Sequence, residues 1–340
     1  MIELSQLSRP PSFCSHQAQP QLTRDLSLSL SQKFIEPMFE ATHQRNPGED
    51  FSRPGAFGAH GGNVRDVDLE RANGVGRIML TGSERGTRIA DVYQKFPIGI
   101  VFPRIGDDLA KEAVVINSSG GIAGGDRLEI EVVALNNASV AVTTQAAEKI
   151  YRALDRPARV STKLKACGTA KLAWLPQETI VFNQARIRRQ TEIDLCSGAE
   201  LIALEWLVLG RAARGEEVVS GHISESWRIK RDGRLIWADS FRVSDEVFAQ
   251  LHRKALLSNW KAVGTLIYFG PSLDTRLRIL REIAASLDCR CAATIVGAII
   301  IVRVAAAASA DLRRGLRGLL EQFSRELGPG PFGVPKMWSC

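Results

Sequence analysis

Three acidic residues stand among apolar residues in stretches that otherwise have the pattern of buried strands. Glu205 interrupts one face of "LIALEWLVLG", Asp239 shares a face with the apolar residues of "RLIWADSF", and Glu178 follows the apolar "LAWLPQ". A buried carboxylate is costly unless it is paired, hydrogen-bonded or hydrated. A buried arginine is the ordinary partner for each. Three such interruptions together also predict an internal polar passage, or a weak site of oxygen ligands for a divalent cation.

A fourth acidic residue, Asp126, closes the glycine cluster "INSSGGIAGGDRLEI" (116–130). A P-loop needs a lysine after its last glycine, and Asp126 stands there instead and would repel phosphate. The dinucleotide fingerprint opens a helix, whereas "RLEIEVVAL" follows here with the pattern of a strand. The cluster therefore predicts a tight double turn between strands, in which the glycines shape the backbone and present one carboxylate.

Nucleophilic and metal chemistry based on histidine finds little support. Three of the five histidines fall in the first 68 residues, which leaves His222 and His252, and there is no Gly-x-Ser-x-Gly elbow. Glycoside hydrolysis by converging carboxylates stays open, because Glu178, Glu205 and Asp239 are far apart in sequence but free to meet in a fold. A carboxylate-dependent hydrolase on a β scaffold is therefore the alternative function.

Composition and charge narrow the class of protein. The longest uncharged apolar run, Cys291 to Val302, is too short for a spanning helix, and no secretory leader is evident, so a cytoplasmic protein is expected. Six scattered cysteines predict free thiols. The net charge of +7 suits an acidic partner, but the arginines lack the interleaved aromatic residues of a nucleic-acid binder, and a β-rich module for acidic partners stays open as a third hypothesis.

The chain divides into two regions. Residues 1–68 hold five proline sites and little periodicity, which predicts a poorly ordered extension, and residues 69–340 are expected to form a single β-rich domain. Gly76 to Val243 shows short runs of period two, typical of strands. A loose repeat places Ala138, Ala170 and Ala199 32 and 29 residues apart, which is typical of stacked sheet layers wound on one another, and ordinary β meanders stay open as the alternative.

The last hundred residues change pattern. A strand near Ala262, an amphipathic helix over Leu273 to Leu287, a strand over Ala293 to Val304 and a helix over Ala310 to Leu327 are predicted. The predicted fold is mainly β, with stacked β-sheet layers and two late α-helices in a β-α-β-α C-terminal segment.

An ordered set of motifs resembles one family. In chain order, the stretches are "GTRIADVYQKFPIGIVFPR" (86–104), "NSSGGIAGGDRLEI" (117–130), "TTQAAEKIYRA" (143–153), "WLPQETIVF" (174–182), "LEWLVLGRAARGE" (204–216), "RDGRLIWAD" (231–239) and "VPKMW" (334–338). Together they resemble the urease accessory protein UreD family, called UreH in some bacteria, over about residues 72 to 338. The resemblance does not reach the first seventy residues.

The resemblance implies a mainly β fold with two helices and a role that is not enzymatic. Its members are scaffolds that assemble with UreF and the GTPase UreG on the urease apoprotein and support nickel delivery, with no tightly bound cofactor. It also implies that Asp126, Glu205 and Asp239 lie along a passage for nickel in transit, with Glu178 a weaker candidate. Oxygen ligands suit transit because they release the ion readily.

Two residues depart from the family's usual pattern. Arg127 follows the Gly-Gly-Asp turn, where a polar or acidic residue is common, and Glu148 stands where a small hydroxyl is usual. Both bear on which side chains line the expected passage.

Overall fold

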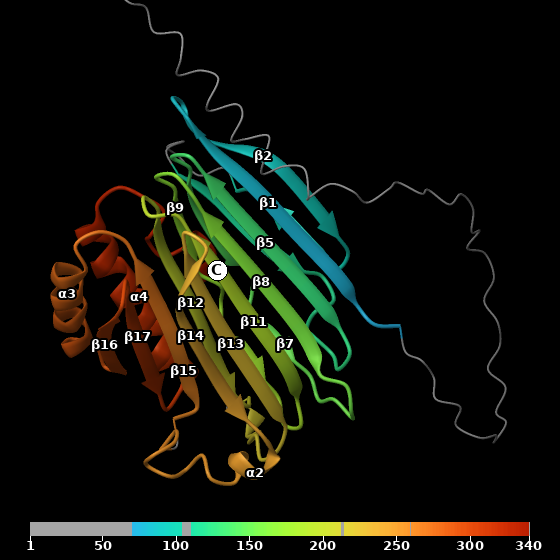
Figure 1. Cartoon of the computed structure of the whole chain (residues 1–340). Coiled ribbons are helices and arrows are strands. Elements are labelled where there is room, and N and C mark those ends of the chain that lie inside the picture. The colour runs from blue at the N-terminus through green and yellow to red at the C-terminus, as the bar shows by residue number, and fades with distance from the viewer. Residues whose placement is uncertain (1–69, 104–109, 212–213, 259, 340) are drawn as a thin grey trace, which may run out of the picture. The chain divides into compact units, whose positions relative to one another are not determined.

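The computed structural model describes residues 70–103, 110–211, 214–258 and 260–339, and the predicted extension, residues 1–68, lies outside them (Figure 1). The described chain is mainly β, as predicted, and forms two sheets. In the first, sheet A, the strand order is β14-β13-β11-β8-β5-β1-β2. Its strands are β1 (Asn73–Ser83), β2 (Gly86–Lys95), β5 (Arg127–Leu135), β8 (Ala158–Ala166), β11 (Arg186–Leu195), β13 (His222–Arg231) and β14 (Arg234–Val243).

The second sheet, sheet B, has the order β16-β17-β15-β12-β9-β6-β4-β3, with β10 beside β12 and β7 beside β10. Its strands are β3 (Ile98–Val101), β4 (Lys111–Asn117), β6 (Ser139–Thr144), β7 (Glu148–Ile150), β9 (Lys171–Trp174), β10 (Thr179–Val181), β12 (Glu200–Leu209), β15 (Ala262–Phe269), β16 (Arg290–Val296) and β17 (Ile299–Ala306). The helices are α2 (Asp245–Phe248), α3 (Leu273–Ala285), α4 (Ser309–Leu327) and the 3₁₀ turn η2 (Lys336–Ser339).

Between β4 and β13 the chain alternates between the two sheets and winds forward, so that neighbouring strands in each sheet run parallel. The repeat seen in the sequence marks this winding, because the alanines Ala138, Ala170 and Ala199 are buried at the turns that enter β6, β9 and β12. The carbonyl of Ala138 accepts from Lys171 N at 2.8 Å, and that of Ala170 accepts from Glu200 N at 2.9 Å. The winding interpretation of the repeat is confirmed.

The turns of the winding also stack, which corrects the expectation of free cysteines for one pair, whereas Cys289 and Cys291 are free as predicted. Cys167 and Cys196 stand on neighbouring turns with their Cα atoms 4.7 Å apart and form a disulfide. Their separation of 29 residues equals one step of the winding, a spacing that scattered cysteines in sequence do not reveal. At the adjacent position, Gly168 has φ +72°, and a Cβ there would meet the carbonyl oxygen of Asn136 at 2.7 Å. Only glycine fits so close a stack without strain.

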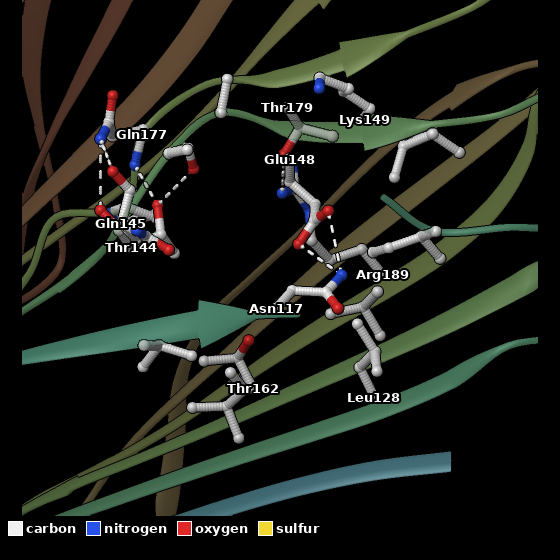
Figure 2. Close-up of a pocket in the computed structure, with 18 of the residues that line it drawn as sticks. Asn117, Leu128, Thr144, Gln145, Glu148, Lys149, Thr162, Gln177, Thr179 and Arg189 are labelled. Carbon is white, nitrogen blue, oxygen red and sulfur yellow. Dashed lines mark hydrogen bonds between the residues drawn. The ribbon is translucent and has the colours of Figure 1, made fainter. Parts of the chain in front are cut away.

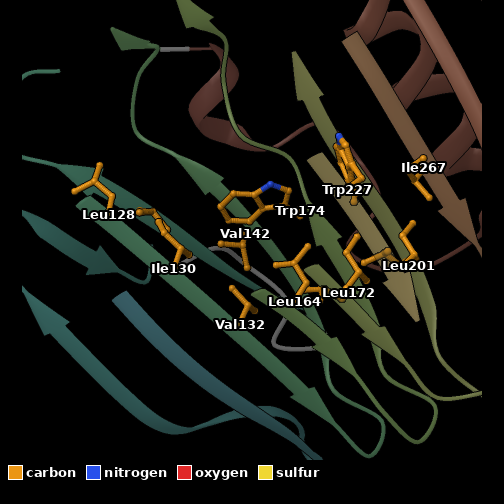
Figure 3. Close-up of a cluster of buried hydrophobic side chains, with 14 of the residues drawn as sticks. Leu128, Ile130, Val132, Val142, Leu164, Leu172, Trp174, Leu201, Trp227 and Ile267 are labelled. Carbon is orange, nitrogen blue, oxygen red and sulfur yellow. The ribbon is translucent and has the colours of Figure 1, made fainter. Parts of the chain in front are cut away.

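A hydrophobic core fills the space between the sheets (Figure 3). It forms because alternate residues of each strand are apolar and point to the same layer. The strand β12 is apolar on both faces, as predicted, because its second face packs under helices α3 and α4. The inner core includes Leu128, Ile130, Val132, Val142, Leu164, Leu172, Trp174, Leu201, Trp227 and Ile267.

The C-terminal segment confirms both late helices and corrects one strand. Helices α3 and α4 lie within one or two residues of their predicted bounds and cover the outer face of sheet B (Figure 1). The single strand predicted over Ala293 to Val304 is a hairpin of β16 and β17, because Gly297 (φ +56°) turns the chain between them. The apolar residues on both sides of Gly297 concealed this turn. None of the helices in the described residues has both the length and the apolar character needed to cross a membrane.

Candidate functional site

The site begins at a break in sheet B. β12 is continuous, but its parallel neighbour is interrupted: β9 pairs with β12 up to Trp174 and β10 resumes the pairing at Thr179. The next strand along is interrupted in the same way between β6 and β7, at residues 145–147. Glu205 lies on β12 opposite the first break. The missing ladder leaves room for side chains and solvent beside this one carboxylate.

Glu205 forms the centre of a buried ionic cluster that joins the two sheets. Its Oε2 lies 2.8 Å from Arg189 Nη1, and Arg189 rises from β11 in sheet A. The Arg189 guanidinium also pairs with Glu225 on β13 and donates to Thr179 Oγ1 at 2.7 Å. Trp174 Nε1 donates to Glu205 Oε1 at 2.9 Å. We call Arg189, Glu205 and Glu225 the ionic cluster.

Burial dominates the electrostatics of this cluster. Glu205 is 5% exposed, and burial raises its pKa, an effect that the charge of Arg189 opposes but does not cancel. Burial alone would lower the pKa of Arg189, but Glu205 and Glu225 reverse the shift and hold it above its ordinary value. The guanidinium therefore stays charged and balances two carboxylates in a setting of low dielectric.

Two cavities meet at Glu205. The first, of about 160 Å³, lies at the break in sheet B, with Arg189, Glu148 and Gln177 in its wall (Figure 2). The second, of about 440 Å³, lies between β13 and β14 of sheet A and β12, β15, β16 and β17 of sheet B. Glu205 lines both cavities. The ionic cluster thus stands between two cavities whose walls are otherwise largely apolar.

Asp239 belongs to the second cavity, as does Glu225 of the ionic cluster. Asp239 Oδ2 lies 2.5 Å from Arg303 Nη2, and the Arg303 guanidinium also donates to Thr265 Oγ1 at 2.5 Å. Thr265 faces Glu205 across the β12–β15 ladder. The structure thus brings two of the predicted carboxylates, Glu205 and Asp239, to one cavity and gives each an arginine partner.

Asp126 has a different environment. Its carboxylate is 6% exposed and accepts from Ala72 N at 3.0 Å and from Ala123 N at 2.7 Å. It lines neither cavity, but the turn that it holds places Gly120 and Ile122 in the wall of the first one. As the glycine pattern predicted, Gly120, Gly121 and Gly125 have positive φ. Asp126 therefore shapes the site through the backbone.

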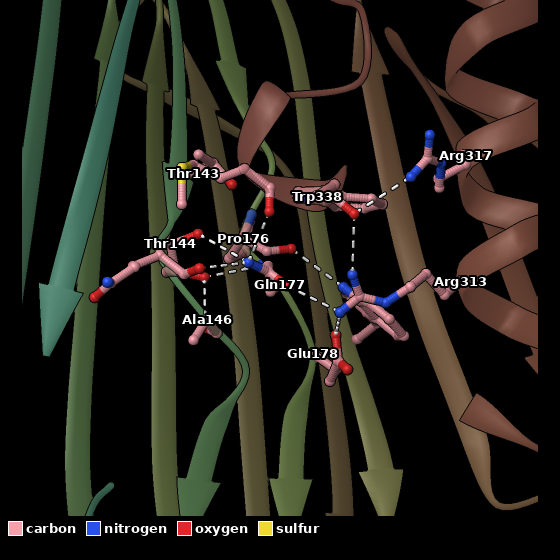
Figure 4. A network of polar contacts seen from close by, with 12 residues as sticks. Thr143, Thr144, Ala146, Pro176, Gln177, Glu178, Arg313, Arg317 and Trp338 are labelled. Atoms are coloured by element: carbon pink, nitrogen blue, oxygen red, sulfur yellow. Dashed lines mark hydrogen bonds and ion pairs between the residues drawn. The ribbon is translucent and has the colours of Figure 1, made fainter. Parts of the chain in front are cut away.

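Glu178 faces the C-terminal helix. It forms an ion pair with Arg313 of α4 at 2.5 Å, and Arg313 also donates to Gln177 Oε1 at 2.9 Å (Figure 4). Trp338 Nε1 donates to Leu175 O at 3.2 Å in the same region. Glu178 lines neither cavity, so the structure separates it from Glu205 and Asp239. Its ion pair fastens helix α4 to the break between β9 and β10.

Sequence reasoning missed two residues of the site, Arg189 and Glu225, but it did indicate that Glu148 bears on the lining of the passage. Arg189 carried a signal, because it interrupts the apolar face that Ile187, Ile193 and Leu195 form on β11. Glu148 lines the first cavity, and Asn117 Nδ2 donates to both of its oxygens at 3.1 and 3.2 Å. Arg127, the other departure from the family pattern, is exposed on the outer face of sheet A.

The donor set around the cavities consists of carboxylates held by arginines. Within the described residues, no group of three or more His, Cys, Asp or Glu side chains has the arrangement of a metal site. Glu205, Glu225 and Asp239 nevertheless line one cavity together with Cys291. With each acid already paired to an arginine, this arrangement does not form a tight metal site.

A test of the cavity electrostatics uses Glu148. Burial raises the pKa of Glu148, with Asn117 and Arg189 acting in the opposite direction. The folded state therefore binds this proton more tightly than the unfolded chain, and stability falls as pH rises through the raised pKa. The free energy of unfolding of the Glu148→Gln variant, compared with that of the wild type, is therefore expected to increase as pH rises from about 4 to about 8. Urea unfolding at the two pH values measures this difference.

The control for this measurement is Glu129→Gln, an exposed carboxylate on the outer face of β5. In this control, the change in the free energy of unfolding between the two pH values should stay close to that of the wild type. A Glu148→Gln variant whose relative stability does not rise with pH would show that the cavity is well hydrated around this residue.

Comparison with known proteins identifies the family to which the chain is similar. A family model described as "UreD urease accessory protein" matches residues 72–339. A Rhizobium etli protein named urease accessory protein UreD is 40% identical over 273 residues, which cover 79% of this chain and 96% of that protein. The protein of that name in Xanthobacter autotrophicus is 36% identical over 271 residues, covering 79% of this chain and 91% of that protein.

A Brucella ovis protein named urease accessory protein UreD 1 is 36% identical over 279 residues, 82% of this chain and 97% of that protein. These names describe an accessory protein rather than a catalytic enzyme. The matched range begins two residues after the start of the described chain and includes the ionic cluster and both cavities. The chain therefore belongs to the UreD family of urease accessory proteins.

Proposed function

We propose that this protein is a non-catalytic scaffold of urease maturation, which assembles with UreF and UreG on the urease apoprotein and supports nickel insertion. Family membership supports the urease role. We infer a cytoplasmic location for this scaffold. In this proposal nickel is the cargo and the scaffold keeps no tightly bound cofactor.

The observation that carries the nickel role is the position of Glu205 between two cavities. Its carboxylate, with Glu225 and Asp239 beyond it, offers oxygen ligands to a cation that enters the second cavity. Ni²⁺ prefers nitrogen and sulfur ligands when it is held tightly, so carboxylates suit an ion in transit. We propose that Glu205 and Asp239 line the passage and that Asp126 maintains its wall. Glu178, fastened to Arg313, is the weaker candidate.

The assembly is tested by co-purification. A tagged form of the chain, co-expressed with its cognate UreF, UreG and urease subunits, is expected to capture UreF and the urease apoprotein. Urease produced without this chain should contain little nickel. A failure to bind UreF, or normal nickel content in urease made without the chain, would rule out the maturation role.

The passage is tested with two isosteric variants, Glu205→Gln and Asp239→Asn. Each removes a negative charge from the second cavity, so each is expected to lower urease activation and nickel content several-fold while the UreF complex still forms. Asp91→Asn, which removes an exposed charge from the edge strand β2 of sheet A, is the control and should activate urease normally. If the variants lose the complex itself, the carboxylates are structural and the passage proposal fails, although the scaffold role stands.

A further inference from the structure

The outer face of sheet A carries arginines in one row across the strands. Arg127 on β5 is in register with Arg159 on β8, which is in register with Arg188 on β11. The row continues through Ser224 on β13 to Arg242 on β14. We call Arg127, Arg159, Arg188 and Arg242 the arginine row. All four are exposed, and none of them has an ion pair among the described residues.

A second row on the same face shows how the sheet usually arranges charge. Four residues further along each strand, positive and negative side chains alternate from β1 to β13, and Arg77 Nε lies 3.6 Å from Glu131 Oε2. We call this set the alternating row: Arg77, Glu131, Lys163, Glu192 and Arg228. Opposite charges on neighbouring strands stabilise a sheet, and like charges destabilise it. The arginine row therefore departs from the local pattern at a cost to the fold.

The arginine row borders a groove of about 530 Å³. Arg127, Arg159 and Arg188 line it together with hydroxyl and amide side chains, among them Ser161 and Ser226. In the described residues, helices α3 and α4 pack on sheet B and not on this face (Figure 1). Guanidinium groups beside hydroxyl groups form a surface of hydrogen-bond donors suited to carboxylates.

We propose that the arginine row is a docking site for an acidic segment of a protein partner. Charge complementarity is the argument: a bound run of carboxylates would neutralise like charges that the fold otherwise leaves facing one another. From Arg127 to Arg188 is two strand spacings, roughly 10 Å, and Arg242 is roughly 19 Å from Arg127. An extended segment of about six residues covers that span.

Other occupants fit this surface less well. The positive strip is one row wide, because Glu129 in the groove and Glu131 and Glu192 in the alternating row flank it with negative charge. Nucleic acid presents phosphates over a broader surface, and single strands also need aromatic residues for stacking, which the groove lining lacks. A second copy that docked symmetrically through the same face would bring one arginine row against another. An acidic polypeptide is the partner that the charges favour, independently of the proposed maturation role.

The test measures binding of a fluorescein-labelled oligoglutamate peptide of about eight residues to the full chain by fluorescence anisotropy. The variant Arg127→Gln/Arg159→Gln/Arg188→Gln is compared with Arg77→Gln/Lys163→Gln/Arg228→Gln, which loses the same formal charge from the alternating row. The row variant is expected to bind at least about tenfold more weakly, and the control less than about threefold. Binding by the wild type should weaken as salt rises from about 50 mM to about 200 mM.

Circular dichroism and thermal unfolding check that both variants fold, and the single variant Arg188→Gln is a milder test of the same surface. If the two triple variants lose peptide affinity equally, net charge alone explains the binding and the proposal is overturned. So would the absence of saturable binding at low salt. A labelled oligothymidylate of the same length that binds more tightly, and loses binding with the arginine row, would assign the surface to nucleic acid instead.

Discussion

Replacing Arg189 with methionine is expected to lower the free energy of unfolding by about 3–5 kcal/mol, because the change leaves Glu205 and Glu225 buried without their cation. Methionine fills much of the same volume as arginine. The loss of stability therefore comes mainly from the removed charge and not from lost packing. Urea unfolding measures it directly. Because single domains are stable by only about 5–15 kcal/mol, this loss is a large share of the total.

The matched control is Arg188→Met, one residue earlier on the same strand but exposed on the opposite face. It is expected to change stability by less than about 0.5 kcal/mol. Adding Glu205→Gln and Glu225→Gln to Arg189→Met should restore part of the stability, because no unpaired charge then stays buried. If Arg189→Met costs no more than Arg188→Met, the ionic cluster is hydrated and does not tie the sheets together.

Asp126→Ala is expected to lower the free energy of unfolding by about 2–4 kcal/mol. The change removes both acceptors of the Ala72 and Ala123 amides, and a hydrogen bond to a charged group is worth about 1.5–3 kcal/mol when fully buried. Asp126→Asn should lose part of this, because an amide offers one acceptor oxygen where the turn needs two. Thermal and urea unfolding give the size of each effect.

Asp91→Ala is the control for Asp126, since Asp91 is an exposed acid on the edge strand β2. It should stay within about 0.5 kcal/mol of the wild type. An Asp126→Ala variant of normal stability that nonetheless fails to activate urease would give Asp126 a direct role in the passage. A destabilised variant would instead attribute lost activation to the collapsed turn.

The strands and the winding were predictable because their signals are local. Period two marks strands such as β1, β5 and β11, and Ala138, Ala170 and Ala199 mark the repeated entry into sheet B. The hairpin of β16 and β17 was not predicted, because apolar residues continue on both sides of the turn at Gly297. The stacking of Cys167 on Cys196 depends on the length of one winding step, which a single sequence gives only loosely.

The site was predictable in kind but not in its partners. Glu205 stood out because a carboxylate in a strand apolar on both faces must be compensated, and a buried arginine was the ordinary expectation. That Arg189 supplies it follows from two sheets facing each other, a relation with no fixed spacing in sequence. Asp126 was expected to line the passage, but it lines neither cavity. Its partners are amides that any residue carries, so its structural role had no signal in the sequence.

The forward winding from β4 to β13 has a consequence for how the chain acquires its structure. Each strand pairs with strands about 30 residues away, so loop closure costs a similar and modest entropy at every step. Assembly can then proceed by adding one coil to the last, as in other proteins whose units contact only their neighbours. The ion pair between the sheets at Arg189 requires β11, β12 and β13 together, so it locks only after these coils are in place.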